Sequence, residues 1–451
     1  MLFLVPLLAQ SRPAPPPQEI LQPQEVRPLP GHLDTVPVFN SNSPELVSSE
    51  GILLSTFPPG GKRVPAAHLN FQFRGRFDVF AHHIAKAPNP QDLRSLYLGV
   101  ILYNPSSQPV TVSVLQAASY LTQPDAPFIP LPSWVENPLG SVFSGPGSRV
   151  SDQVLRGQHQ PDWPALLTIP PQESQLLMNL PILLRGLTPP LNGRSTLVRL
   201  RSSGPVYAAS LALFGRQNPD GSERPPTLVE WQNLLETGNL VSPRDRTPNP
   251  PDQPSGSIVY GRVAGVAQGS RWQAQITDRP SVPYLTIPAP GQAFSYGLST
   301  LKGGALGTGQ IQSAPMLARY PDTAYRANGN YGIEYNLTLP LRNRTQSPQT
   351  VTLTMQTPLK QDQLQGGLRF LEPLPPQIFF RGTVRIRFTN NQGLPQTRYV
   401  HLVQQRGQKG EALATVFLPP QSDRLVQVDW LYPPDATPPQ VLTIETFSSG
   451  N

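Results

Sequence analysis

The chain has 451 residues, of which 58 are proline and none is cysteine. Proline at about 13%, against a usual value of about 5%, excludes a protein built of long helices, and the missing cysteines exclude disulfide scaffolds and thiolate metal sites. The formal net charge of +7 arises entirely after residue 257, because residues 1–257 carry 18 basic and 18 acidic side chains. No run of like charge marks a nucleic-acid-binding arm.

The first residues have the character of an export signal. Residues 1–9 are apolar and precede Gln10 and a proline-rich run. They are typical of the end of a secretory leader cleaved after Ala9, although a basic segment in front of them is missing. We therefore expect an exported protein; the alternative is an N-terminus that is apolar by chance. No later stretch reaches the length of about 18 apolar residues that a spanning helix needs.

Residues 10–36 are proline-rich and are expected to be extended or mobile. From residue 37 onward, short runs of alternating apolar and polar residues recur between turn residues. Examples are residues 96–103, 110–115 and 207–214. This pattern predicts a first β-sandwich domain over residues 37–216.

One helix is predicted between the halves of the chain. Thr227 and Glu230 form a capping box, Gly238 suits the C-terminal stop, and Leu228, Trp231 and Leu235 fall on one face. The helix and a proline-rich stretch make residues 217–257 a linker. We expect the helix to dock on its own domain, with partner binding as the alternative.

A weak internal repeat links the halves. Leu98, Val100, Leu102 and Asn104, followed by Pro109, recur 239 residues later as Leu337, Leu339, Leu341 and Asn343, followed by Pro348. Each copy indicates a β-hairpin that turns between the asparagine and the proline. The fold class is therefore predicted as all-β: two tandem antiparallel β-sandwich domains, the second over residues 258–451, with one short linking helix. Chance similarity of generic strands is the alternative.

Histidines supply the main metal-site candidate. His82 and His83 follow a predicted strand, and adjacent strand residues point to opposite faces, so the two cannot easily chelate one ion. One of them could join His68 and Asp78 as imidazole and carboxylate ligands. The favoured interpretation is no metal site, with one histidine beside the core and the other in solvent.

A second candidate is an arginine cluster on a hairpin predicted over residues 383–388 and 398–403. Arg385 and Arg387 are two residues apart and share a strand face, and Arg398 would join them if it lies directly across. Three guanidinium groups on one surface would favour an anionic partner, such as the carboxylates or phosphates of an envelope polysaccharide. A salt-bridged surface without a partner is the alternative.

Catalytic motifs are missing from the sequence. It contains no nucleophile elbow, zinc-protease helix or phosphate-binding loop. We therefore predict a protein that is not an enzyme and needs no cofactor. The alternative is a carbohydrate-binding protein or a divergent polysaccharide-active enzyme: a flat aromatic strip would favour the binder, and a cleft lined with acids would favour the enzyme. Trp134, Trp163, Trp272 and Tyr284 are aromatics that could stack on sugars or cap the core.

Three stretches, residues 38–45, 75–84 and 304–315, resemble a family of exported cyanobacterial proteins of unknown function. The resemblance extends over nearly the whole chain after the leader. It implies a bacterial periplasmic, envelope or extracellular setting and no particular activity. Together these observations predict a non-catalytic structural or binding protein of the cell envelope or extracellular matrix, with an anionic polysaccharide or an envelope protein as its partner.

Overall fold

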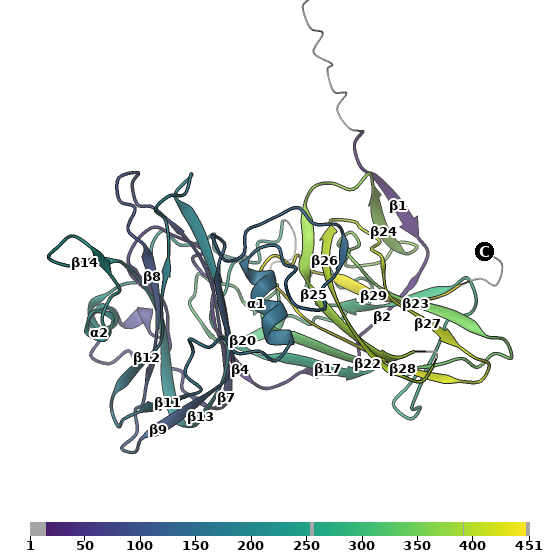
Figure 1. The fold of residues 1–451 in the computed structure, drawn as a ribbon, viewed down its shortest axis with the longest axis horizontal. Helices are drawn as coiled ribbons and strands as arrows, with labels where there is room; N and C mark the ends of the chain where they lie inside the picture. Colours follow the sequence, from purple (N-terminus) through teal and green to yellow (C-terminus); the bar gives the residue numbers. More distant parts are fainter. Residues whose placement is uncertain (1–14, 253–256, 391, 448–451) are drawn as a thin grey trace, which may run out of the picture.

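The computed structural model describes residues 15–252, 257–390 and 392–447. The chain is mostly β, and its sheets gather in two groups that lie side by side with one short helix between them (Figure 1). The expected leader, residues 1–9, lies outside the described residues.

The first group is a single twelve-stranded sheet. Its central strand β13 is 24 residues long and bends, so that one end pairs with β7 and β9 while the other pairs with β6 and β8. The strands are β4 (Pro37–Ser41), β5 (Leu46–Val47), β6 (Gly51–Ser55), β7 (Phe73–Lys86), β8 (Leu96–Tyr103), β9 (Val110–Leu121), β11 (Leu166–Ile169), β12 (Ser174–Ile182), β13 (Leu191–Phe214), β16 (Ala264–Gln268), β20 (Ala314–Arg319) and β21 (Arg326–Ala327).

The second group contains an eight-stranded, a five-stranded and a two-stranded sheet. The eight strands are β3 (His32–Leu33), β10 (Trp134–Glu136), β17 (Arg271–Gln275), β18 (Leu285–Thr286), β22 (Glu334–Arg342), β25 (Ile378–Thr389), β26 (Pro395–Gln405) and β28 (Asp423–Leu431). The five are β2 (Glu25–Arg27), β19 (Ala293–Leu298), β23 (Gln349–Gln356), β27 (Ala412–Leu418) and β29 (Gln440–Thr446), and the two are β1 (Gln18–Gln22) and β24 (Leu368–Glu372). A separate small hairpin joins β14 (Arg216–Gln217) to β15 (Glu223–Arg224).

The pairing departs from the purely antiparallel arrangement expected from the sequence. β4 and β5 run parallel to β7, β17 and β18 run parallel to β22, and β2 runs parallel to β19. Each of these pairs joins segments far apart in the chain or separated by a long connection, which allows the parallel direction. Local alternation predicts the strands and leaves their directions open.

Strands also pass between the two halves of the sequence. The proline-rich N-terminal segment contains strands β1, β2 and β3, which pair with β24, β19 and β17 of the second half. Conversely, β16 pairs with β4, and β10 pairs with β26. The N-terminal segment therefore forms part of the second group of sheets, where the sequence suggested an extended or mobile tail.

The hydrophobic interior follows the same arrangement. One cluster, which includes Phe39, Phe77 and Val198, fills the space that the bent twelve-stranded sheet encloses. A second cluster fills the second group of sheets and continues across the junction to Phe80 and Leu197 on the outer face of the first. Burial of apolar side chains therefore holds the two groups together as well as each one separately.

The predicted helix is present as α2 (Leu228–Thr237), and its capping box is formed as expected. Its Trp231 and Leu235 are buried against Ile52 and Ile101 of the first half, so the helix docks on its own side of the molecule.

A second helix, α1 (Pro146–Leu155), was not predicted, and the expectation of a single helix is wrong. Its N-cap, Gly145, offers no side-chain hydrogen bond, so the usual start signal is missing. Packing stabilises the helix instead, because Val150 and Val154 belong to the second hydrophobic cluster, the one that continues across the junction. A Cβ on Gly147 would lie 2.4 Å from Cδ of Pro434, so this close approach requires glycine.

The repeated asparagines form two matching corners. The side-chain nitrogens of Asn104 and Asn343 each donate to three backbone carbonyls at 2.7–3.1 Å, one across their own turn and two on a later strand end. These acceptors are Gln108, Ile169 and Pro170 for Asn104, and Ser347, Leu418 and Pro419 for Asn343. The repeat therefore has a structural counterpart in both halves.

A glutamine with positive φ completes each corner. Gln172 has φ 58° and Gln421 has φ 53°, and each side-chain nitrogen donates at 2.6 Å to a carbonyl of the asparagine turn. The prediction of hairpins at these turns is nevertheless wrong. β8 pairs with β12 and β13 while β9 pairs with β11 and β13, and β22 and β23 lie in different sheets. Alternation is the same in a strand that crosses between layers as in a hairpin, so it cannot name the pairing partner.

Candidate functional site

The candidate site lies at the junction between the two groups of sheets. Alternation along β7 places Asp78, Phe80 and His82 on the face toward the second group, and β13 places Leu197 and Arg199 beside them. This face is the outer side of the first group, and without the second group it would expose apolar side chains and charges together.

A buried ion pair crosses the junction. Nη2 of Arg199 on β13 lies 2.7 Å from Oε2 of Glu334 on β22, and both side chains are less than a tenth exposed. Burial raises the pKa of Glu334, but the charges of Arg199 and Arg271 outweigh burial and hold that pKa at about 2. Removing one partner from such a pair leaves an uncompensated buried charge, which is strongly destabilising.

Asp78 lies on the first-half side of this pair. It is ion-paired with Arg76, and its Oδ2 lies 3.9 Å from Nε of Arg199. Burial raises the pKa of Asp78 against the opposing charges of the two arginines. Asp78 is therefore part of the ion-pair network of the junction.

The network continues into the second group through Asn336. Its side-chain nitrogen donates at 2.8 Å both to Glu334 and to Asp429. Asp429 in turn accepts from Arg385 at 3.0 Å and from Arg387 at 2.9 Å. The carboxylate between these two arginines is thus supplied by the chain itself.

The predicted arginine hairpin is present as β25 and β26, but Arg398 does not join the other two arginines. It lies opposite Ile386 in the register, so its side chain is on the other face of the sheet from Arg385 and Arg387. There it is ion-paired with Glu136 of β10. The register differs by one residue from the one that would gather all three guanidinium groups.

The histidines occupy three separate environments. Nδ1 of His68 lies 2.8 Å from Oγ of Ser55. His83 is buried in the first half between Ser41 and the carbonyl of Pro44. Burial lowers the pKa of both His68 and His83 to about 4.

His82 faces the junction instead, where Nδ1 lies 2.8 Å from Oγ of Ser195 and Nε2 lies 3.7 Å from Glu45. It is buried, whereas the sequence suggested that one of the pair would lie in solvent. Among the described residues, no three histidine, aspartate or glutamate side chains converge as metal ligands. His68, Asp78, His82 and His83 are thus not brought together.

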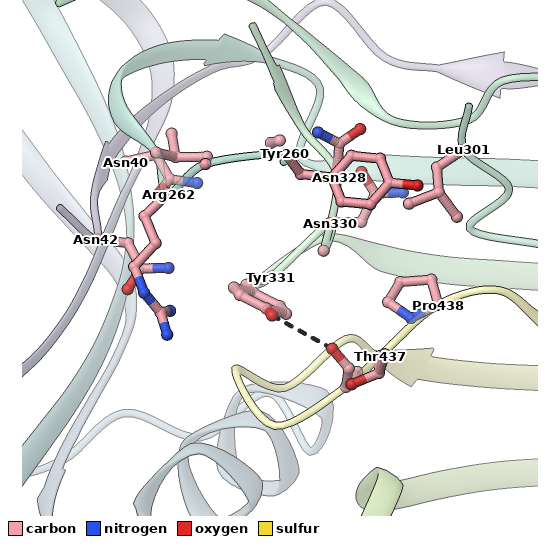
Figure 2. Close-up of a pocket in the computed structure, with 15 residues that line it drawn as sticks. Asn40, Asn42, Tyr260, Arg262, Leu301, Asn328, Asn330, Tyr331, Thr437 and Pro438 are labelled. Carbon is pink, nitrogen blue, oxygen red and sulfur yellow. Dashed lines mark hydrogen bonds between the residues drawn. The ribbon is translucent and has the colours of Figure 1, made fainter. Parts of the chain in front are cut away.

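Beyond His82 a crevice opens at the junction, with a volume of about 180 Å3. Figure 2 shows Asn40, Asn42 and Arg262 along one side of it and Tyr260, Asn328 and Leu301 along another. The exposed Thr437 forms part of the wall, so the crevice reaches solvent there.

Two polar atoms in this crevice lack partners. The side-chain oxygens of Asn40 and Asn42 are buried and accept no hydrogen bond from the described residues. Unpaired buried polar atoms are costly in native proteins, so each of these two oxygens calls for a hydrogen-bond donor. The sequence carried one signal for them, since a run of four polar residues, Asn40 to Ser43, follows Phe39 where a buried segment would favour apolar ones.

The crevice can be compared with the two sugar-related alternatives raised by the sequence, a carbohydrate-binding protein and a polysaccharide-active enzyme. Among its described lining residues there is no aspartate or glutamate, so it lacks the carboxylate pair that glycoside hydrolysis needs. Of the four aromatics considered for sugar stacking, Trp163 and Trp272 are buried, and Trp134 packs against Arg398. The tyrosines at the crevice, Tyr260 and Tyr331, were not among them.

Comparison with known families decides the classification. The sequence pattern of the family described as "Protein of unknown function (DUF3370)" matches residues 24–446. This chain belongs to that family. No curated protein matches the chain.

Solved structures resemble this family member only distantly. Lac15 from a marine microbial metagenome is 11% identical with a TM-score of 0.11, over 84% of this chain and 53% of its own, so the chain spans about half the length of that protein. The coconut allergen cocosin is 10% identical with a TM-score of 0.10, over 84% of each chain. A variant of the oxalate decarboxylase of B. subtilis is 10% identical with a TM-score of 0.10, over 84% of this chain and 77% of its own. Within the described part of the chain, no helix is long and apolar enough to cross a membrane.

Proposed function

We propose that this DUF3370 protein is a non-catalytic structural or binding protein of the bacterial cell envelope or extracellular matrix. In this proposal residues 1–9 are an export signal, and residues 37–216 and 258–451 are two tandem β-sandwich domains fixed against each other. The observation that carries it is the junction, where the buried pair of Arg199 and Glu334 lies within a hydrophobic core shared by both halves.

A junction of this kind suits a rigid scaffold. Domains that move relative to each other usually meet through smaller and more polar interfaces. Here strands pair across the halves, as β4 does with β16 and β10 with β26, and relative motion would break those hydrogen bonds. The lining residues that the structure describes include amides and tyrosines and no carboxylate, which supports binding in preference to hydrolysis.

For the partner we propose an envelope polysaccharide or an envelope protein. An anionic chain would have to compete with Asp429 for Arg385 and Arg387, and with Glu136 for Arg398. Electrostatic attraction to these arginines would therefore be weak and sensitive to salt.

The test is to fractionate cells that produce the protein natively and to locate it with an antibody. We expect it in the periplasmic, envelope or extracellular fraction, with an N-terminus near Gln10 by mass spectrometry. Isolated envelope material should sediment the purified protein, whereas the same material stripped of polysaccharide and protein should not. An intact Met1 on protein confined to the cytoplasm would contradict the proposal.

A further inference from the structure

We propose that the junction crevice is a binding site for a neutral sugar unit, which the oxygens of Asn40 and Asn42 recognise through its hydroxyl groups. This inference rests on the proposed function and deepens it by naming a ligand class. It concerns the crevice lined by residues of β4, the segment before β16, the loop after β21 and the segment before β29.

The first argument is the unpaired amide oxygens. Asn40 is 4% exposed and Asn42 is 2% exposed, and the Oδ1 atom of each has no donor within the described chain. Each amide also carries an Nδ2 donor beside its oxygen, so a matching group must both donate and accept hydrogen bonds. The hydroxyl groups of a sugar do both.

The second argument is the charge of the walls. Arg262 is the only charged side chain among the described lining residues, and it is ion-paired with Glu45. The carboxylate neutralises the guanidinium, so the crevice holds no net charge that would select an anion.

The third argument is the pair of aromatic rings. Tyr260 and Tyr331 line the crevice, and their hydroxyl groups are already engaged. That of Tyr260 donates to the carbonyl of Lys302 at 2.6 Å, and that of Tyr331 donates to the carbonyl of Ala436 at 3.3 Å, the bond drawn in Figure 2. Nζ of Lys360 lies over the Tyr260 ring, 4.0 Å from its centroid, so only the remaining ring surface is left for a ligand. That surface packs against the C–H groups of a sugar as it does against other apolar groups. A volume of about 180 Å3 is small for a ligand pocket and suits one ring.

The walls are also held in place without a ligand. The backbone N–H of Asn42 donates to Val263 at 2.8 Å, and the following residue, Ser43, donates to Asp245 at 2.7 Å. On the facing side Asn330 is fixed by hydrogen bonds to Ser299 and Tyr335. A site formed in advance loses less entropy when it binds.

The experiment uses the full chain and four probes, the methyl glycosides of glucose, galactose and mannose together with glucuronate, in titration calorimetry and saturation-transfer NMR. We expect at least one neutral glycoside to bind with a Kd of about 1 mM, and glucuronate to bind no more tightly. Asn42→Ala should weaken binding about tenfold, the effect of losing one hydrogen bond.

Asn179→Ala is the matched control. The Oδ1 atom of Asn179 is also buried and unpaired, but it lies outside the crevice, so binding should be unchanged. Thr437→Trp at the exposed rim should block entry and abolish binding, and it gives a result even if Asn42→Ala fails to fold.

The proposal is overturned if none of the three glycosides binds at about ten times that concentration, which would mean that the crevice holds only water. It is also overturned if glucuronate binds more tightly, or if Asn179→Ala weakens binding as much as Asn42→Ala. Failure here, with the protein still found in the envelope, would refute the ligand class and leave the proposed function standing.

Discussion

The two asparagine corners are alike in their hydrogen bonds but differ in the segments inserted after them. Asn104 and Asn343 each fix three carbonyls, and a positive-φ glutamine closes each turn. The first strand after each corner, β9 or β23, pairs with a later strand, β11 or β27. Between these two strands the first copy inserts β10 and α1, whereas the second inserts β24, β25 and β26. The repeated part is the framework of each half.

The inserted parts of the two copies meet at the junction. α1 packs against β25 and β28, and the carbonyl of Leu155 at its end accepts from Arg385 at 3.2 Å. The first insertion also supplies β10, which pairs with β26 of the second. The corners therefore maintain the two halves, while the segments that differ between the copies join them.

The largest effect is expected at the junction itself. Glu334→Ala leaves Arg199 buried without its partner and should lower the free energy of unfolding by about 3–5 kcal/mol. Urea denaturation should then show two transitions in place of one. Glu25→Ala, which removes an exposed ion pair, is the control and should cost less than about 1 kcal/mol.

A double variant separates charge from packing at this position. Arg199→Met combined with Glu334→Leu removes both charges and should restore much of the stability. If the double variant is as unstable as Glu334→Ala, the effect of the single change did not come from the unpaired arginine.

The second effect is a loss of stability in mild acid. Burial holds the pKa of His83 in the first half and of His401 in the second at about 4, against 6.5 in the unfolded chain. The unfolded state therefore binds protons that the native state does not, and stability is full above pH 6.5 and falls as the pH drops toward 4. At about 1.4 kcal/mol for each pKa unit, His83 accounts for roughly 3 kcal/mol.

Urea denaturation between pH 7 and pH 4 measures this loss, and His83→Gln should flatten the profile. Glu334 does not obscure the upper part, because the stability it gives through its low pKa is lost only as the pH falls below about 4.5. An unchanged slope in His83→Gln would show that this imidazole does not titrate as its burial implies.

The third effect compares the corners directly. Asn104→Ala and Asn343→Ala each remove the side-chain donor that three carbonyls share, and each should cost about 2 kcal/mol, measured by thermal or urea unfolding. Because the corners do not share partners, the costs should add in the double variant. Asn218→Ala, in a surface turn, is the control and should cost less than either corner variant. A large difference between the costs of Asn104→Ala and Asn343→Ala would show that the two corners are not equivalent.

The corners also show how far sequence reasoning reached. The constant spacing of 239 residues identified Asn104 and Asn343, because the same short pattern of alternating residues surrounds each turn. The spacing did not predict the pairing of β8 and β9. Their partners are β11, β12 and β13, and the alternation of residues along a strand does not indicate which strand it pairs with. The arginine hairpin was found for the same local reason, and its register was uncertain by one residue.

The candidate site was harder to predict. Asn40 and Asn42 belong to no catalytic or binding motif, and they are distinguished by the missing donor beside each oxygen, which only the packed structure shows. α1 was missed because Gly145 provides no cap and the helix is stabilised by the second half of the chain. α2 was predicted because Thr227 and Glu230 form a capping box, which marks the first residues of a helix in the sequence.

The smallest effect on stability is expected at the N-terminus of α2. Thr227→Ala removes the side-chain acceptor for the N–H of Glu230 and should cost about 1 kcal/mol, measured by urea denaturation. Thr237→Ala, at the other end of the same helix, should be nearly neutral because its hydroxyl only donates to a carbonyl of its own last turn. Equal costs would show that capping contributes little here.

The N-terminal strands have a consequence for the order in which the protein can assemble. β3 leaves the ribosome early, yet its partner β17 is made about 240 residues later. At a synthesis rate of about 5–20 residues per second, the strand waits roughly 10–50 s for its partner. For that time the proline-rich stretch before β4 stays unpaired, and its prolines, which lack the N–H that another strand would bind, protect the nascent chain from pairing with its neighbours.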